Sequence, residues 1–282
     1  MFILPKNVGA EGSEDRKRHP NVGPPEGCTV QSVGWARRNV DVRCRSRFSV
    51  RRAILRSAGL AVVGALWSGC QTGQSEVRRA ERCDANMAIE KARAYGLVSV
   101  VAVDSTILID QRYARPGNVF GEALYPSNLP CLLAGRTAAR LAKAQAFLRQ
   151  NGYGLRVWDA WRPPEAHRKL WERKAMGDYV SNPKKGWSRH CYGRAVDVTL
   201  VHADGRECVM PTAFDDFSPQ AAWNAEVSDP KALEHRDWLQ RAMVRAGFHL
   251  LETEWWHFND AEDEEKMEGP PVFARDLGIA LP

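Results

Sequence analysis

The sequence predicts an α+β fold, with helices packed on a small, mainly antiparallel sheet in a single domain. Segments of strand period and segments of helical period follow one another in mixed order, without the regular strand-helix alternation of a doubly wound fold. No glycine-rich phosphate-binding loop is present. The 282 residues, of which 44% are hydrophobic and 26% charged, are typical of a globular protein, so composition alone indicates no function.

Four segments are predicted to be strands because they are rich in β-branched or aromatic residues, or alternate between apolar and polar residues. In residues 195–200 the alternation is strict, which places Ala195, Asp197 and Thr199 on one face and three aliphatic residues on the other. The aliphatic face is therefore predicted to be core. The four predicted strands are residues 98–109, 154–159, 195–200 and 248–258.

Three segments have the spacing and the end signals of helices. Residues 137–150 have apolar positions at helical intervals, with Thr137 available as a cap and Asn151-Gly152 as a stop. A second helix is predicted from Pro163 to about Ala175, because proline is tolerated in a first helical turn. The third, about Leu233 to Ala246, is ended by Gly247.

The first 84 residues are predicted to lie outside the domain, which is assigned to residues 85–282. Residues 49–70 combine the pair Arg51 and Arg52, an apolar stretch of about ten residues and Ser-Gly-Cys70, the order of an export signal with a lipidation site at Cys70. An ordinary cleaved signal peptide is the alternative, and the apolar stretch is too short to span a bilayer. Residues 1–48 are predicted to be a disordered extension or the product of a start site assigned too far upstream, and residues 71–84 a linker.

Positive charge is concentrated in this N-terminal part. Residues 1–69 contain 12 of the 40 basic and 5 of the 34 acidic residues, which leaves 28 basic and 29 acidic residues from Cys70 onward. A nucleic-acid-binding surface needs cations clustered on the folded domain. We therefore expect no nucleic-acid partner, and membrane contact only through a lipid anchor at Cys70.

The four cysteines after Cys70 and most histidines have no assigned role in this sequence. Cys83, Cys131, Cys191 and Cys208 have the three possible disulfide connectivities of any four cysteines, and their spacing does not match paired CxxC elements, so none is predicted to bind metal. The histidines outside any motif are predicted to be surface or structural residues: His19, His167, His202, His235 and His249.

One constellation has the composition of a catalytic metal site. His190 and Asp197 are joined by a loop containing Gly193, and together with His257 they would give Zn²⁺ two imidazoles and a carboxylate, leaving a fourth position for water. Glu254 lies three residues before His257 and could accept a proton from that water. In a regular strand these two residues face opposite ways, so the assignment requires a bend, or the end of the strand, between them. Read from spacing alone, structural roles for these residues remain open.

Three separated motifs resemble one known family. The strings LRVWDAWRPPEAH, SRHCYGRAVDVTL and ETEWWHF are similar to those of the D-alanyl-D-alanine dipeptidases, the VanX-like zinc peptidases, and the resemblance extends from about Val98 to Leu281. It implies hydrolysis of a small D-amino-acid peptide with one Zn²⁺ per chain. The implied site residues are the ligands His190, Asp197 and His257, the base Glu254, the oxyanion-stabilising Arg162, Ser188 beside the substrate, and Asp215 at its amino group.

Departures from the family pattern leave the substrate open. Arg115 and Val119 replace residues of the YATxxNFxG motif, and Pro211 replaces a glycine before Asp215. The leading hypothesis is an exported dipeptidase of the periplasm or cell envelope that acts in cell-wall peptide turnover. Its alternatives are a D,D-carboxypeptidase or endopeptidase acting on peptidoglycan stem peptides, and a non-catalytic cell-wall binding lipoprotein.

Overall fold

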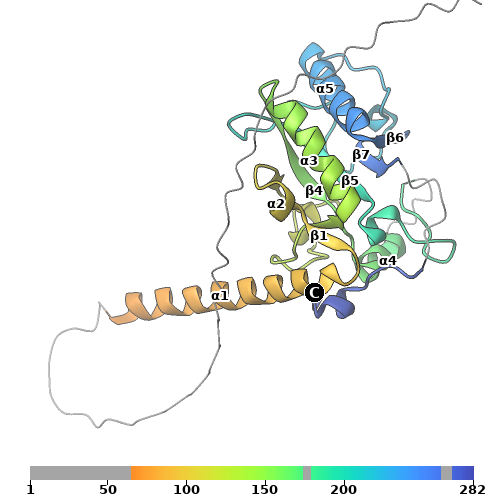
Figure 1. Cartoon of the computed structure of the whole chain (residues 1–282). Coiled ribbons are helices and arrows are strands. Elements are labelled where there is room, and N and C mark those ends of the chain that lie inside the picture. The colour runs from red at the N-terminus through yellow and green to blue at the C-terminus, as the bar shows by residue number, and fades with distance from the viewer. Residues whose placement is uncertain (1–64, 174–178, 262–268) are drawn as a thin grey trace, which may run out of the picture. The chain divides into compact units, whose positions relative to one another are not determined.

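The computed structural model describes residues 65–173, 179–261 and 269–282. The main element is a five-stranded sheet (Figure 1) in which every neighbouring pair except β2 and β4 is antiparallel. This confirms the predicted α+β fold. Its strands in spatial order are β2 (Leu108–Ile109), β4 (Tyr153–Asp159), β5 (Ala195–His202), β7 (Glu254–Asp260) and β6 (Phe248–Leu251).

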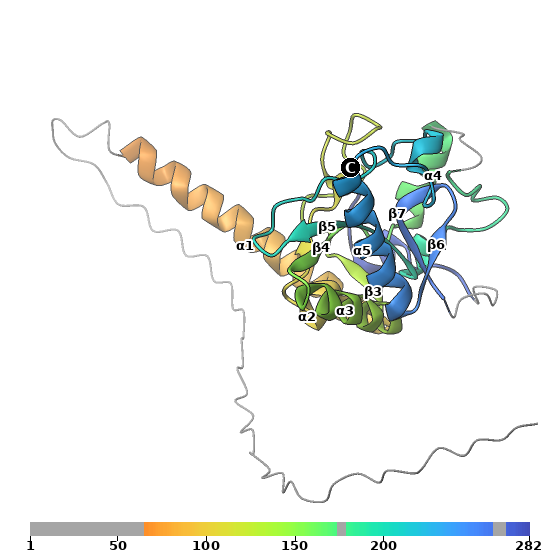
Figure 2. The same ribbon diagram turned by 90° about the horizontal axis from the view of Figure 1, so that it is seen from above.

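Two longer helices, α3 (Gly135–Arg149) and α5 (Pro230–Ala246), pack against each other and on one face of this sheet (Figures 1 and 2). They bury the face of β5 that carries Val196, Val198 and Leu200, which confirms the predicted core face. α5 begins three residues earlier than predicted, since Asp229 accepts a hydrogen bond from the Lys231 amide and Pro230 occupies the first turn.

The opposite face of the sheet is partly covered by smaller elements and a second buried cluster. The cluster joins α1 (Ala65–Arg93), the segment 113–134 and α4 (Pro164–Arg173). A separate two-stranded antiparallel sheet, β1 (Leu97–Ser99) with β3 (Leu132–Ala134), lies beside it. The remaining short helices are α2 (Val100–Val103) and the 3-10 turns η1 (Arg112–Ala114), η2 (Arg189–Tyr192), η3 (Pro219–Ala221) and η4 (Ala274–Leu277).

The predicted strand over 98–109 is wrong as a single element. It is divided into β1, one helical turn and β2. The Val100 amide donates to the carbonyl of Cys131, and Asp104 accepts hydrogen bonds from both the amide and the hydroxyl of Thr106. The chain therefore turns within a segment whose β-branched residues favour a continuous strand.

The predicted strand over 248–258 is a hairpin. β6 ends at Leu251, a turn follows at Glu252 and Thr253, and β7 begins at Glu254. This break places Glu254 at the start of a strand instead of its middle.

The N-terminal predictions lie largely outside the described residues. This holds for the extension 1–48 and for most of the signal 49–70, and the side chain of Cys70 is not described. Residues 71–84, predicted to be a linker, form part of α1, whose last turns contribute the buried Ala88 and Ala92 to the domain. Within the described chain, no helix has the length and apolar content that a membrane crossing requires.

Candidate metal centre and active-site cavity

Local structure around Gly193 brings His190 back to the sheet. His190 lies in η2, where the Ser188 hydroxyl accepts a hydrogen bond from its amide at 3.3 Å. Gly193 then ends η2 with a φ of 64°, and a Cβ there would lie 2.7 Å from Leu97 and 2.8 Å from the Ala134 amide nitrogen. Only glycine fits this turn, which returns the chain into β5 with His190 beside Asp197.

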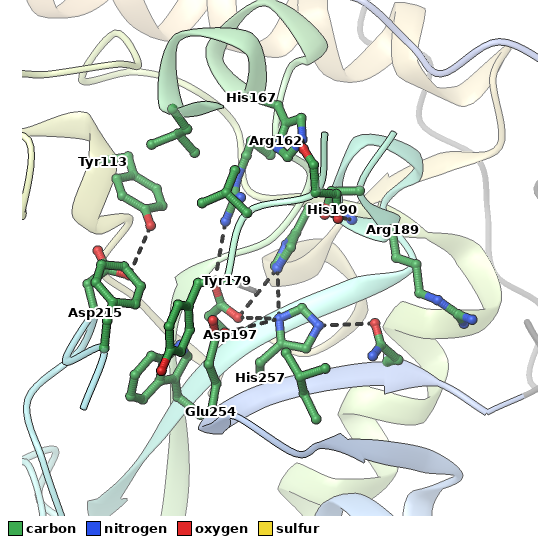
Figure 3. A pocket seen from close by; sticks show the side chains of 18 of the residues that line it. Tyr113, Arg162, His167, Tyr179, Arg189, His190, Asp197, Asp215, Glu254 and His257 are labelled. Atoms are coloured by element: carbon green, nitrogen blue, oxygen red, sulfur yellow. Dashed lines mark hydrogen bonds and ion pairs between the residues drawn. The ribbon is translucent and has the colours of Figure 1, made fainter. Parts of the chain in front are cut away.

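The three predicted ligands converge in the structure (Figure 3). Asp197 on β5 is directly opposite His257 on β7, and the Asp197 Oδ1 lies 2.9 Å from the His257 Nδ1. The His190 Nε2 lies 3.2 Å from the His257 Nδ1 and 3.4 Å from the Asp197 Oδ1. An ion held tetrahedrally at 2.0–2.2 Å from each ligand requires ligand separations of about 3.3–3.6 Å. Two of the three separations lie at or near this range, and the one between Asp197 and His257 is shorter. The three atoms therefore lie close enough together to bind one small cation.

Hydrogen bonds on the far side of each imidazole fix which nitrogen carries the proton. The His190 Nδ1 donates to the carbonyl of Ala160 at 2.8 Å, and the His257 Nε2 donates to the Asn259 Oδ1 at 3.0 Å. The nitrogens that face Asp197 are therefore lone-pair donors, oriented as metal-binding histidines usually are. Three buried lone-pair atoms without a proton between them form a site for a cation, and two imidazoles with one carboxylate suit Zn²⁺.

Glu254 borders this centre because the β6–β7 pairing is irregular. Leu250 is opposite Phe258 and Leu251 is opposite Glu254, so moving by one residue along β6 corresponds to moving by four residues along β7. The bend expected between Glu254 and His257 is therefore present, and the Glu254 Oε2 lies 3.9 Å from the His257 Nδ1. Burial raises the pKa of Glu254 to about 7. A carboxylate with this pKa can both take up and release a proton near neutral pH.

Arg162 lies at the junction between β4 and α4, where it is held by Asp159. The fully buried Asp159 Oδ2 accepts hydrogen bonds from the Arg162 Nε at 2.8 Å and its Nη2 at 2.7 Å. The same Nη2 lies 3.7 Å from the Asp197 Oδ2. Burial lowers the pKa of Arg162, but Asp159 raises it further, so the guanidinium stays charged. A fixed positive charge is thus placed at the edge of the metal centre.

Asp215 lies on the other side of the cavity, beside Tyr113 (Figure 3). The Tyr113 hydroxyl donates to the Asp215 Oδ1 at 3.0 Å, whereas the Asp215 Oδ2 is buried without a hydrogen-bond partner. Among the described residues Asp215 is the only non-glycine residue with positive φ, at 59°. Burial raises the pKa of Asp215 to about 7, and the charge of Asp197 adds to the rise. A buried carboxylate oxygen without a donor is a ready partner for a cationic group.

These residues surround one cavity of about 350 Å³, near the lower limit for small-molecule sites. Ser188 lines it, as do the aromatic rings of Tyr179 and Phe217, whose centroids are 5.0 Å apart. Of the four tryptophans near the motifs, Trp256 lines the cavity and Trp158, Trp161 and Trp255 belong to the core. The cavity therefore has the size and the charged walls of a site for a short, polar ligand.

All seven residues predicted for the site line this cavity. Three further residues, to which the sequence motifs assigned no role, support the site through hydrogen bonds. Asp159 holds Arg162, Asn259 fixes the tautomer of His257, and Tyr113 binds Asp215. Asp159 lies within the motif LRVWDAWRPPEAH, and Asn259 follows His257 by two residues on the same strand face, so the sequence contained a signal for both residues.

Comparisons with known proteins point to one family. A family model described as D-ala-D-ala dipeptidase matches residues 93–270. D-alanyl-D-alanine dipeptidase of Escherichia coli is 32% identical over 163 residues, which cover 57% of this chain and 83% of that protein. The Enterococcus faecalis enzyme of the same name is 27% identical over 168 residues, with 53% and 83% covered. A Streptomyces coelicolor enzyme of that name is 28% identical over 183 residues, with 56% and 88% covered.

Proposed function

The chain belongs to the D-alanyl-D-alanine dipeptidase family of zinc metallopeptidases, and we propose from this that its own substrate is D-alanyl-D-alanine, released as two D-alanines. Peptide-bond hydrolysis follows from the family. The choice of the free dipeptide is supported by the small cavity and by the unpartnered Oδ2 of Asp215.

Zn²⁺ is the proposed cofactor, one ion held by His190, Asp197 and His257. The observation that supports this most strongly is the pair of outward hydrogen bonds, to Ala160 and Asn259, which leave two imidazole lone pairs facing a carboxylate. When bound, such an ion polarises the scissile carbonyl and lowers the pKa of a water molecule.

Glu254 is the proposed general base. Its carboxylate would take the proton of the attacking water and then deliver it to the departing amine, which a pKa near 7 allows in both directions. Arg162 would stabilise the negative charge that develops on the carbonyl oxygen, because its guanidinium is fixed by Asp159 before substrate binds.

Asp215 is proposed to select the free dipeptide. The Oδ2 of Asp215 has no hydrogen-bond partner among the described residues, and the ammonium group of D-alanyl-D-alanine would supply both a donor and a charge. In a stem peptide the same nitrogen is an uncharged amide. Ser188, whose hydroxyl borders the cavity, is proposed to lie beside the bound dipeptide.

The proposed location is the periplasm or cell envelope, with a role in cell-wall peptide turnover. It rests on the export signal at 49–70 and the lipidation site at Cys70. Mass analysis of the N-terminus of protein made in its native host tests this proposal. An acylated Cys70 would support it, whereas an unprocessed chain beginning at Met1 in the cytoplasm would contradict it.

The substrate proposal is tested with zinc-loaded protein and three substrates, following release of D-alanine. D-alanyl-D-alanine is the proposed substrate, N-acetyl-D-alanyl-D-alanine replaces its ammonium group by a neutral acetamide, and a stem pentapeptide represents the carboxypeptidase alternative. We expect rapid cleavage of the free dipeptide alone. Cleavage of the acetylated or pentapeptide substrate in preference to the dipeptide would instead assign a D,D-carboxypeptidase. Absence of cleavage of all three by zinc-loaded protein would favour the binding lipoprotein.

A further inference from the structure

A second cluster of metal-binding side chains lies outside the active-site cavity. Its members are His202 at the end of β5, Cys208 just beyond the following turn, and His235 in α5. Each offers one ligand atom, and these atoms all lie within 4.8 Å of one another. Neither histidine nor Cys208 was predicted to bind metal from the sequence, because they are not arranged as a recognised motif.

The backbone brings the first two of these residues together. The His202 amide donates to the Arg206 carbonyl at 2.8 Å, and the Cys208 amide donates to the Leu200 carbonyl at 3.1 Å, so the chain turns and returns alongside β5. Gly205 provides the turn, with a φ of 84°. This tight hairpin places His202 and Cys208 on neighbouring positions at the sheet edge, facing α5.

This cluster is separate from the catalytic centre. His202 lies five residues after Asp197 along β5, which corresponds to about 17 Å at 3.4 Å per residue. An odd number of steps also places the two side chains on opposite faces of the sheet. His202 shares the face of its cross-strand partner Tyr153, which packs against Trp238 of α5.

The surroundings orient the cluster for coordination. The His235 Nδ1 donates to the Val209 carbonyl at 2.8 Å, which leaves its Nε2 as a lone-pair donor, the arrangement usual for metal-binding histidines. His235 and Cys208 are buried, with 7% and 5% of their surface exposed, while His202 is half-buried and borders a cavity of about 480 Å³. Among the described residues, neither the His202 imidazole nor the Cys208 thiol has a hydrogen-bond partner. The rings of His202 and His235 lie 5.7 Å apart, and Tyr153 packs against both.

We propose that His202, Cys208 and His235 bind a second metal ion, of the thiophilic divalent class that Zn²⁺ represents. Two imidazoles and one thiolate are a ligand set that Zn²⁺ and copper accept and that Mg²⁺ and Ca²⁺ do not. The ion would connect the hairpin after β5 to α5. Its role is structural, since no catalytic residue lies on that face of the sheet.

Metal content and cobalt spectroscopy test this proposal on the intact protein. After removal of metal and reconstitution, we expect two Zn²⁺ per chain, falling to one in Cys208→Ser and in His235→Gln, with D-alanine release unchanged. Cobalt gives a more specific signal, because the active-site ligands are nitrogen and oxygen only. A thiolate-to-cobalt charge-transfer band would therefore not come from the active-site ion.

Matched variants separate this site from the catalytic one. His257→Ala should lose the catalytic ion and keep the charge-transfer band, whereas Cys208→Ser should lose the band and keep the catalytic ion. Cys131→Ser, which removes another buried thiol with no role in the cluster, should keep both. One Zn²⁺ per chain in the parent protein, or a cobalt form without a thiolate band, would overturn the proposal even if dipeptidase activity is intact.

Discussion

The hydrogen bonds of Asp159 make Asp159→Asn an informative substitution. Its Oδ1 accepts from the Tyr125 hydroxyl at 2.9 Å and from the Ala160 amide at 3.0 Å, while its Oδ2 accepts from two nitrogens of Arg162. Asparagine can keep the first pair with its carbonyl oxygen. Its amide group then occupies the position of Oδ2 and presents N–H groups to the N–H groups of Arg162.

The size of the effect follows from these contacts. The substitution removes two charge-assisted hydrogen bonds, each contributing about 1.5–3 kcal/mol, from a pair in which Asp159 is fully buried and the Arg162 side chain is 9% exposed. Breaking one side of a buried ion pair costs about 3–5 kcal/mol. We expect the free energy of unfolding to fall by this amount, a large part of the roughly 5–15 kcal/mol of an ordinary domain. Because Arg162 also loses its orientation, we expect kcat/KM to fall by about 10²- to 10³-fold, as when one oxyanion donor is removed.

Urea unfolding of the metal-free protein measures the stability change, and D-alanine release by zinc-saturated protein under native conditions measures the rate. Asp260→Asn is the matched control, since Asp260 is also fully buried and is held by Arg140 and by the Thr137 hydroxyl on α3. It should lower stability without lowering kcat/KM. An Asp159→Asn protein with a loss below about 1 kcal/mol and unchanged kcat/KM would refute the assignment of Asp159 as the residue that holds Arg162.

Four further outcomes are expected. Glu254→Gln should keep the active-site Zn²⁺ and lower kcat by about 10²- to 10⁴-fold, whereas loss of that metal would show that Glu254 is a ligand. The pKa of Glu254 is raised to about 7, and its basic form is the active one, so kcat/KM should fall as the pH drops below about 7. Bound Zn²⁺ would shift this limb toward the ordinary glutamate pKa of about 4.3, so a profile that stays flat down to pH 4 would exclude Glu254 as the titrating base. Asp215→Asn should raise KM for D-alanyl-D-alanine about 10- to 100-fold and reduce discrimination against the N-acetyl form, while an unchanged KM would remove Asp215 from amine recognition. Chelation should abolish activity and Zn²⁺ should restore it; activity that survives complete metal removal would contradict a metallopeptidase.

The chain motifs were enough to predict most of the active site. Two short-range pairs, His190 with Asp197 and Glu254 with His257, indicated metal chemistry, and the strict alternation around Asp197 predicted which face of the strand it lies on. The helices α3, α4 and α5 were also predictable, because proline and glycine mark their ends and apolar residues recur at helical spacing. These features depend on residues close together in the chain.

Other features depended on contacts between distant segments. The division of residues 98–109 follows from a hydrogen bond to Cys131, and the position of Glu254 follows from how β7 pairs with β6. No local pattern contains these partners, so intrinsic strand preference misled the prediction at both places.

The sequence by itself predicted the candidate metal centre, because the proposed ligands lie in motifs whose residue types and order resemble those of one family. Only the tertiary structure decided which groups complete that centre and which lie elsewhere. The tertiary structure pairs Arg162 with the buried Asp159 and leaves one oxygen of Asp215 without a hydrogen-bond donor. It also brings His235 of α5 to the hairpin that carries Cys208. The physical reason is that burial and coordination depend on distances in space, which the folded chain sets between residues far apart in sequence.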